Sequence, residues 1–188
     1  MKLYDISQEI LSCKVYPGDP KPEQQTLCDM EKGDWYNLTA FSMCAHNGTH
    51  VDAPRHFLKE GKTVEQLPLE TFLGDCYVAR HQGNVTADDA KKLLDTGAER
   101  ILIAGPATVT EEAAKVFAGI LLLGNESQTV GPEDAPMAVH KILLGAGTVL
   151  LEGVVLTEVP EGWYFLNAAP LNMAGAEGMP CRAWLMEQ

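Results

Sequence analysis

The second half of the chain alternates short apolar segments with segments that carry helix-start and helix-end residues. The apolar runs suited to strands lie at 75–80, 100–104, 120–123 and 148–152. Thr86 and Thr110 precede two of the intervening segments as N-cap residues. Gly97 and Gly119 follow the same segments as helix stops, and a third helix is predicted over 136–144. Strands that alternate with helices favour an α/β fold with a partly parallel sheet.

The first third of the chain is richer in strands than in helices. A short strand is predicted at 3–6, and two strands at 25–30 and 35–43 are predicted to form a hairpin around Gly33-Asp34. Two closing strands are expected at 163–167 and 181–186. No repeat or linker divides the chain, so we predict a single compact α/β domain over residues 1–188, with a mixed sheet, helices and N-terminal antiparallel strands.

Charge and apolar patterning exclude two classes of partner. The formal net charge is −12 and no basic run is present, which argues against a nucleic-acid partner. No apolar stretch approaches the roughly 20 residues that span a bilayer, so we expect no membrane partner. The N-terminus lacks a basic start followed by an apolar run, and therefore shows no secretory signal.

Cysteine usage indicates a reducing compartment. Five cysteines occur singly, with no C-x-x-C pair, at positions Cys13, Cys28, Cys44, Cys76 and Cys181. An odd number of scattered thiols is typical of a cytoplasmic protein without disulfides. Cys44 precedes the histidine-rich segment, and it is either an additional metal ligand or, as we favour, a small buried residue.

The segment from His46 to Phe57, HNGTHVDAPRHF, concentrates three of the five histidines and one carboxylate. His50 and Asp52 leave the same face of an extended chain because they are two residues apart. Gly48 lets the backbone turn and bring His46 beside that pair. Such a cluster predicts a divalent metal in a partly open site, as metal-assisted hydrolysis requires.

Two residues further along the chain are candidates for the same site. Glu152 ends an apolar strand, where a buried carboxylate would need a metal or another partner, although an exposed strand edge is an equal alternative. His140 lies on the predicted third helix and, taken alone, is more typical of a structural histidine. Thr49 is either a residue that orients a ligand or a simple turn hydroxyl.

The pattern His46-x-Gly48-Thr49-His50-x-Asp52-x-Pro54-x-His56-Phe57 resembles the signature of the cyclase family of metal-dependent hydrolases, which includes bacterial kynurenine formamidases. The resemblance extends over nearly the whole chain. It includes the segments 4–7, 16–19, 124–132, 150–153, 159–162 and 169–183. The family fold is a compact α/β domain, usually oligomeric.

The resemblance implies a centre of two divalent metal ions. His46, His50 and Asp52 match the ligands of the first ion. Asp52 and Glu152 match carboxylates that bridge to a second ion, which His140 also binds. His56 matches the catalytic proton donor and acceptor. Zinc is the usual metal and manganese occurs in relatives. A cytoplasmic homodimer or homotetramer acting on a small molecule is expected.

The implied reaction is hydrolysis of an amide, formamide or cyclic amide, as in the conversion of N-formylkynurenine to kynurenine and formate. Tyr16 takes the place of a substrate-lining Trp of the formamidases. Tyr16 and Trp35 are either pocket walls or, equally, aromatic residues that only pack in the core or at the surface. The run 126–129, Glu-Ser-Gln-Thr, departs from the Asp-Thr-Pro-Ser of the family. Two alternatives therefore remain: an enzyme resembling isatin hydrolase that acts on another ring, and a metal-binding protein without turnover.

Overall fold

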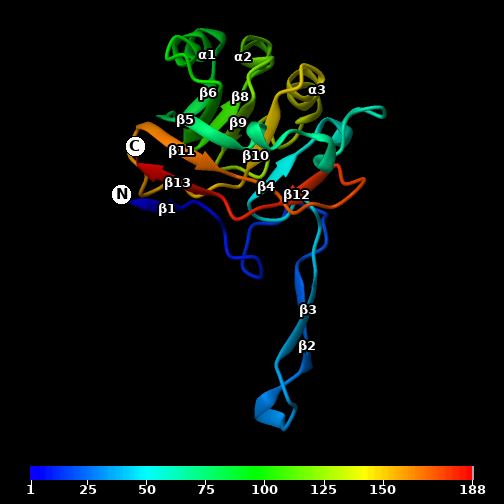
Figure 1. Ribbon diagram of the computed structural model, residues 1–188. Helices are drawn as coiled ribbons and strands as arrows, with labels where there is room; N and C mark the ends of the chain where they lie inside the picture. The colour runs from blue at the N-terminus through cyan, green and yellow to red at the C-terminus, as the bar shows by residue number, and fades with distance from the viewer. Residues whose placement is uncertain (188) are drawn as a thin grey trace.

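A nine-stranded mixed sheet forms the centre of the molecule in a computed structural model that describes residues 1–187 (Figure 1). Its strands are β1 (Leu3–Asp5), β4 (His50–Asp52), β5 (Leu73–Arg80), β7 (Arg100–Ala104), β9 (Leu122–Asn125), β10 (Val149–Glu152), β11 (Gly162–Asn167), β12 (Gly178–Pro180) and β13 (Trp184–Glu187). They lie in the order β1-β13-β11-β5-β7-β9-β10-β4-β12. The central strands β5, β7, β9 and β10 are parallel, and all other neighbours pair antiparallel.

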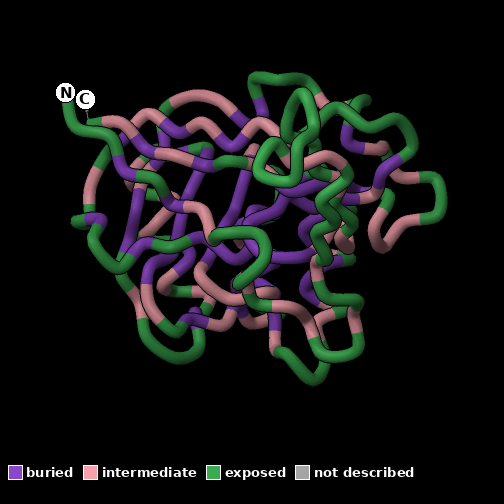
Figure 2. The backbone as a smooth tube through the Cα atoms, turned by 90° about the horizontal axis from the view of Figure 1, so that it is seen from below, coloured by how far each residue is buried: buried purple, intermediate pink, exposed green. Residues whose placement is uncertain are grey.

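Three helices cover one face of the parallel strands: α1 (Ala87–Leu94), α2 (Glu111–Phe117) and α3 (Met137–Gly145) (Figure 1). The hydroxyls of Thr86 and Thr110 cap α1 and α2 by accepting hydrogen bonds from the amides of Asp89 and Ala113. Apolar residues fill both sides of the sheet. One core lies beneath the helices around Ile101, Leu123 and Phe117, and the other lies on the opposite face around Leu102 and Leu151. Figure 2 shows these buried strands inside a rim of exposed loops.

The two ends of the sheet lie close together because the sheet curls. β12 is the last strand in the sheet order and β13 is the second, yet only residues 181–183 separate them along the chain. In a flat sheet, seven strand spacings would separate the two strands by roughly 34 Å. A connection of this length spans at most about 14 Å. The curl therefore folds β4 and β12 back toward the middle of the molecule, where the site described below is built.

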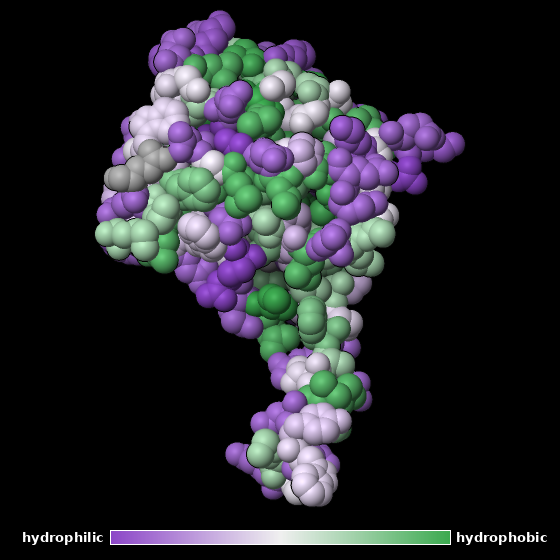
Figure 3. Space-filling view, viewed as in Figure 1, coloured by the Kyte–Doolittle hydropathy of each residue, from purple (hydrophilic) through white to green (hydrophobic). Residues whose placement is uncertain are grey.

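A long hairpin projects from this body. It consists of β2 (Glu23–Cys28) and β3 (Leu38–Ser42), which pair antiparallel and separately from the main sheet. We call residues 22–43 the arm. Figures 1 and 3 show the arm extending well away from the body, with hydrophobic residues at its base and along its length. Its tip carries a short 3-10 turn, η1 (Met30–Lys32), which Asp29 caps by accepting a hydrogen bond from the amide of Glu31.

The predicted elements are largely present, with differences at their ends. The first hairpin strand lies at 23–28 and not at 25–30, because η1 begins at Met30, and the second is confined to 38–42. The strand expected at 120–123 lies at 122–125, and the one expected at 181–186 begins only at Trp184. The sequence analysis did not predict β4, β12 or the small parallel pair β6 (Gly83–Val85) and β8 (Ala107–Val109), because three residues are too few for a periodic pattern. Across residues 1–187, no helix is long and apolar enough to cross a membrane.

Candidate metal centre

Strand pairing brings the histidine-rich segment beside the end of β10. β4 carries His50 and Asp52, and it lies between β10 and β12. In the antiparallel register, Glu152 of β10 is opposite His50, and Leu150 is opposite Asp52. Residues directly opposite in antiparallel strands place their side chains on the same face. The backbone therefore delivers two carboxylates and an imidazole to one buried point.

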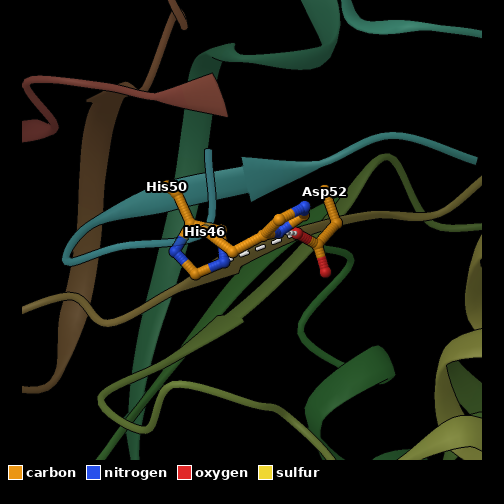
Figure 4. A group of neighbouring side chains, drawn as sticks. All are labelled: His46, His50 and Asp52. Atoms are coloured by element: carbon orange, nitrogen blue, oxygen red, sulfur yellow. Dashed lines mark hydrogen bonds and ion pairs between the residues drawn. The ribbon is translucent and has the colours of Figure 1, made fainter. Parts of the chain in front are cut away.

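Five side chains meet around this point, and four of them are almost completely buried. His50, Asp52, His140 and Glu152 are exposed by no more than 3%. Their ligand-type atoms, with that of His46, form two triads in which every atom lies within 4.8 Å of the others. The first triad is His46, His50 and Asp52, and the second is Asp52, His140 and Glu152. Figure 4 shows the first triad, with His46 hydrogen-bonded to Asp52. Asp52 belongs to both triads.

Backbone carbonyls fix the orientation of two of the imidazoles. His50 Nδ1 donates to the carbonyl of Gly48 at 3.0 Å, and His140 Nδ1 donates to the carbonyl of Pro136 at 2.9 Å. A carbonyl can only accept, so Nδ1 carries the hydrogen in both rings. The Nε2 atoms then face the carboxylates. His50 Nε2 lies 3.5 Å from Glu152, and His140 Nε2 lies 3.2 Å from it. This is how proteins hold a metal-binding histidine in the correct tautomer.

Two properties of the cluster fit the binding of divalent cations: the chemical type of its side chains, and the buried polar atoms that have no hydrogen-bond partner. His50 Nε2 and Asp52 Oδ2 are both buried and have no hydrogen-bond partner. Buried polar atoms without partners are rare in folded proteins, because desolvation is then uncompensated. Imidazole nitrogens and carboxylate oxygens are ligands that zinc and similar cations prefer. The unpaired atoms therefore point to ions in this cluster.

The electrostatics of the metal-free cluster follow from the same contacts. Burial disfavours the charged form of His50, but the nearby carboxylates of Asp52 and Glu152, at 3.4 and 3.5 Å from Nε2, outweigh burial and raise its pKa to about 10. The same competition raises the pKa of His140 to about 10. Burial also opposes ionisation of Asp52, but the surrounding imidazoles of His140, His46 and His50 hold its pKa well below its usual range. In the metal-free protein, His50 and His140 are therefore protonated, and their positive charges offset the negative charges of the two carboxylates.

His46 is held from two sides. Its Nδ1 lies 2.8 Å from Asp52, while its Nε2 lies 3.3 Å from Glu177. Gly178 also contacts the ring, because a Cβ at that position would lie against Cε1 and 2.9 Å from Nε2. Glu177 and Gly178 therefore form a support for His46 where β12 begins. We had not identified either residue from the sequence, where no motif or apolar pattern marks them.

His56 lies next to the triads but belongs to neither of them. It ends the short 3-10 turn η2 (Pro54–His56), and its ring stacks on that of His46 with centroids 4.0 Å apart. Burial lowers the pKa of His56, so the ring is neutral near pH 7. It is thus available to accept a proton beside the cluster.

A cavity of about 300 Å³ opens onto the cluster. Its walls include the imidazoles of four histidines, aromatic and apolar side chains, and several uncharged polar groups. The lining residues are Tyr16, Asp19, Cys44, His46, His50, His56, Phe57, Gln128, Thr129, Pro136, His140 and Glu152. The volume lies at the small end of the range for ligand pockets.

Comparison with known proteins agrees with this geometry. The family model described as Putative cyclase matches residues 4–118. The chain belongs to the cyclase family. It is 33% identical to a kynurenine formamidase of Salinibacter ruber, and the alignment covers 100% of this chain and 98% of the relative.

Solved structures of relatives show the same cyclase fold. One, described as a potential metal-dependent hydrolase with cyclase activity, is 29% identical and superimposes with a TM-score of 0.83 over 98% of this chain and 96% of its own. Isatin hydrolase A from Labrenzia aggregata superimposes with a TM-score of 0.84 over 100% of this chain and 94% of its own. At 19% identity, that likeness concerns the fold alone. Family membership and the buried cluster together place the chain among the metal-dependent hydrolases of this family.

The structure brings together all the residues that the sequence analysis placed at the metal site. Glu152, for which an exposed strand edge was an alternative, is buried within the cluster. Cys44 lines the cavity but belongs to neither triad. Thr49 is a structural hydroxyl, since it donates to the carbonyl of Gly153 at 2.7 Å and accepts from the amide of Gln8.

The two aromatic residues considered as pocket walls, Tyr16 and Trp35, lie in different places in the structure. Tyr16 lines the cavity, and its hydroxyl donates to the carbonyl of Glu133 at 2.8 Å. Trp35 is 96% exposed near the tip of the arm, so of the two interpretations left open for it, a surface aromatic agrees with the structure and a wall of its own chain's cavity does not. The physical reason is that Trp35 lies between η1 and β3 in the arm, and the arm extends away from the body (Figure 1).

Proposed function

We propose that this protein is a metal-dependent hydrolase that cleaves the C–N bond of a small amide, formamide or cyclic amide. The observation that carries the proposal is the pair of triads sharing Asp52, with unpaired His50 Nε2 and Asp52 Oδ2, at the base of a cavity. A structural metal site closes its ligand set, whereas this one adjoins a cavity and a further histidine.

We propose that His46, His50 and Asp52 hold one cation and that Asp52, His140 and Glu152 hold a second, zinc or manganese in either case. Bound there, the cations would supply Lewis acidity and a water of lowered pKa. Asp52 sits between the triads, so its negative charge would offset the mutual repulsion of two cations. The carbonyls of Gly48 and Pro136 keep the imidazoles of His50 and His140 turned toward the site.

His56 is the proposed general base and acid. Its neutral ring takes a proton from the attacking water and gives it to the departing nitrogen. Stacking on His46 fixes the plane of the ring, and contact with Phe57 at a centroid distance of 4.5 Å limits its rotation. The lowered pKa suits this role, because the ring is unprotonated at neutral pH and ready to accept.

The relatives support a formamide as the first substrate to test. Kynurenine formamidases share about a third of their residues with this chain over its full length, which supports N-formylkynurenine. The test is to restore zinc or manganese to metal-free protein and assay N-formylkynurenine, isatin and simple cyclic amides. Metal-dependent hydrolysis of one substrate class supports the proposal. Metal binding with no turnover on any of them would favour a binding protein instead.

A further inference from the structure

His46 meets the cluster in a different way from the other two imidazoles. His50 and His140 turn Nδ1 toward a backbone carbonyl and Nε2 toward the carboxylates. In His46 the two nitrogens are exchanged. Its Nδ1 lies 2.8 Å from Asp52 (Figure 4), and its Nε2 lies 3.3 Å from Glu177. Because the two nitrogens lie on different edges of the ring, Nδ1 is the one that can face a cation held beside Asp52.

The backbone at the start of β12 fixes Glu177 beside this ring. The carbonyl of Glu177 accepts a hydrogen bond from the amide of Ala53 at 2.8 Å, immediately after β4. The next residue, Gly178, pairs with Asp52 in the antiparallel register. A Cβ on Gly178 would clash with Cε1 of His46, so the ring packs directly against the backbone of β12. The carboxylate of Glu177 is thereby held at the outer edge of the ring.

A carboxylate in this position selects one tautomer of the imidazole. An ionised carboxylate only accepts hydrogen bonds, so the hydrogen of a neutral His46 ring is held on Nε2. The lone pair is then on Nδ1, the atom that faces Asp52. Metal-binding histidines commonly donate their other ring N–H to a carboxylate or a carbonyl, which fixes the ring and makes the ligand more basic. Glu177 provides that partner for His46, as backbone carbonyls provide it for the other two imidazoles.

The support of His46 is more open to solvent than the rest of the cluster. The side chain of His46 is 13% exposed, and that of Glu177 is 44% exposed. In the second triad, the side chains of Asp52, His140 and Glu152 are exposed by no more than 3%. Water therefore competes for the hydrogen bond between Glu177 and His46, while it hardly reaches the second triad. The cation of the first triad depends on the ligand that solvent displaces most easily.

We propose that Glu177 is a positioning residue that makes His46 bind its cation through Nδ1, and that the cation of the first triad is the one that dissociates first. The inference rests on the two cations of the proposed function but not on the cleavage step. In His50 and His140 the coordinating atom is Nε2, so the centre combines two kinds of imidazole ligand. Removing the carboxylate of Glu177 frees the ring of His46 to turn or to change its tautomer, which weakens the first triad and leaves the second intact.

Nuclear magnetic resonance of zinc-loaded protein reads the tautomers directly. Isotope-labelled histidine gives signals from only five imidazoles, which are assigned through their backbone resonances. Long-range proton–nitrogen correlation spectra distinguish a protonated ring nitrogen from a metal-bound one. We expect His46 to be protonated at Nε2 and zinc-bound at Nδ1, and His50 and His140 to show the reverse. Zinc on Nε2 of His46 would overturn the inference.

Stepwise competition with a chromogenic chelator tests the role of Glu177. In Glu177→Ala we expect the affinity for the more weakly held zinc to fall about tenfold or more, and the affinity for the other zinc to change by less than about twofold. Glu177→Gln should retain most of the affinity, because the amide oxygen still accepts from Nε2. Glu158→Ala is the matched control, since Glu158 is exposed and does not line the cavity. Equal weakening of both ions in Glu177→Ala, or affinities equal to those of Glu158→Ala, would overturn the positioning role.

The same measurements separate this inference from the proposed function. If the wild type binds two zinc ions and Glu177→Ala binds both with unchanged affinity, the positioning role falls and the metal-dependent hydrolase stands. If the tautomers and affinities are as expected but no substrate is hydrolysed, the positioning role stands and the hydrolase proposal falls. If the wild type binds no zinc, both fall together.

Discussion

Glu152 lies opposite His50 in the register of β10 and β4, so the sheet itself sets the spacing of the two residues. His50 Nε2 and Glu152 Oε2 are consequently 3.5 Å apart although about a hundred residues separate them in sequence. A cluster built on paired strands is rigid, and rigid ligands are what a catalytic metal site requires.

His56→Ala is expected to retain metal and lose most turnover. The ring stacks on His46 without belonging to either triad, so its removal leaves every proposed ligand in place. General acid–base groups typically contribute at least about a hundredfold to the rate, and we expect a loss of that size in kcat. Metal analysis beside steady-state kinetics checks this. A His56→Ala protein that no longer holds metal would mean that His56 is itself a ligand.

The stability of metal-free protein should fall as the pH rises above neutrality. The pKa values of His50 and His140 are raised to about 10 in the folded protein, from about 6.5 when unfolded. Their contribution is therefore fully present below about pH 6.5 and is lost as the pH approaches 10. Urea unfolding from pH 6 to 10 measures the loss, and zinc-loaded protein is the control, since bound metal replaces those protons. If the free energy of unfolding of the metal-free protein stayed constant or rose over this pH range, His50 and His140 would not be protonated beside the carboxylates in the folded state.

Gly178→Ala should weaken metal binding by displacing His46. The new methyl group would occupy the position of the imidazole ring, whose Nε2 lies 2.9 Å from the added Cβ. Glu177→Gln should have a smaller effect, because the amide can still accept from His46 Nε2. Gly145→Ala is the matched control, since open space surrounds that position in α3 and alanine favours helix. Competition with a chromogenic zinc chelator gives the affinities. Equal affinities in Gly178→Ala and Gly145→Ala would contradict the support role of β12.

The arm predicts self-association. It exposes a set of large apolar side chains: Leu27, Met30, Trp35, Tyr36, Leu38 and Phe41. An isolated two-stranded hairpin is only marginally stable in water. The arm therefore needs a packing partner that is always available to the folded chain. We propose that this partner is a second copy of the same chain. Apolar residues at the base of the arm, Phe41 and Met43, also border a groove of about 750 Å³ that can receive a second copy.

Sedimentation velocity tests the arm. We expect the wild type to sediment as a dimer or tetramer and the double variant Trp35→Ser, Phe41→Ser to shift toward monomer. Leu69→Ser is the control, because Leu69 is 62% exposed on the body rather than on the arm. A wild-type protein that remains monomeric at high micromolar concentration would refute this proposal.

The sequence pattern was sufficient for the alternating elements and for grouping His46, His50 and Asp52, whereas Glu152 and His140 joined the predicted site only through the family resemblance. Thr86 and Thr110 cap the helices they were expected to cap, because capping is a local interaction. The side chains of His50 and Asp52 lie on the same face of β4, as their two-residue spacing predicted, because side chains alternate between the two faces of a strand.

What could not be predicted depends on contacts between distant segments. Glu177 and Gly178 reach His46 only because the curled sheet brings β12 beside β4. The role of Trp35 could not be decided, because the sequence predicted the hairpin but not its projection from the body.

The most direct test of the metal centre is to count ions on wild-type protein and on Asp52→Ala. Metal-free samples are equilibrated with zinc, freed of excess by gel filtration, and analysed by inductively coupled plasma mass spectrometry. Because Asp52 belongs to both triads, we predict two ions per wild-type chain and almost none on Asp52→Ala, with activity lost in parallel. Asp19→Ala, in the same cavity wall, should keep both ions. Wild-type protein without bound zinc, or Asp52→Ala with an undiminished count, would contradict a centre organised around this carboxylate.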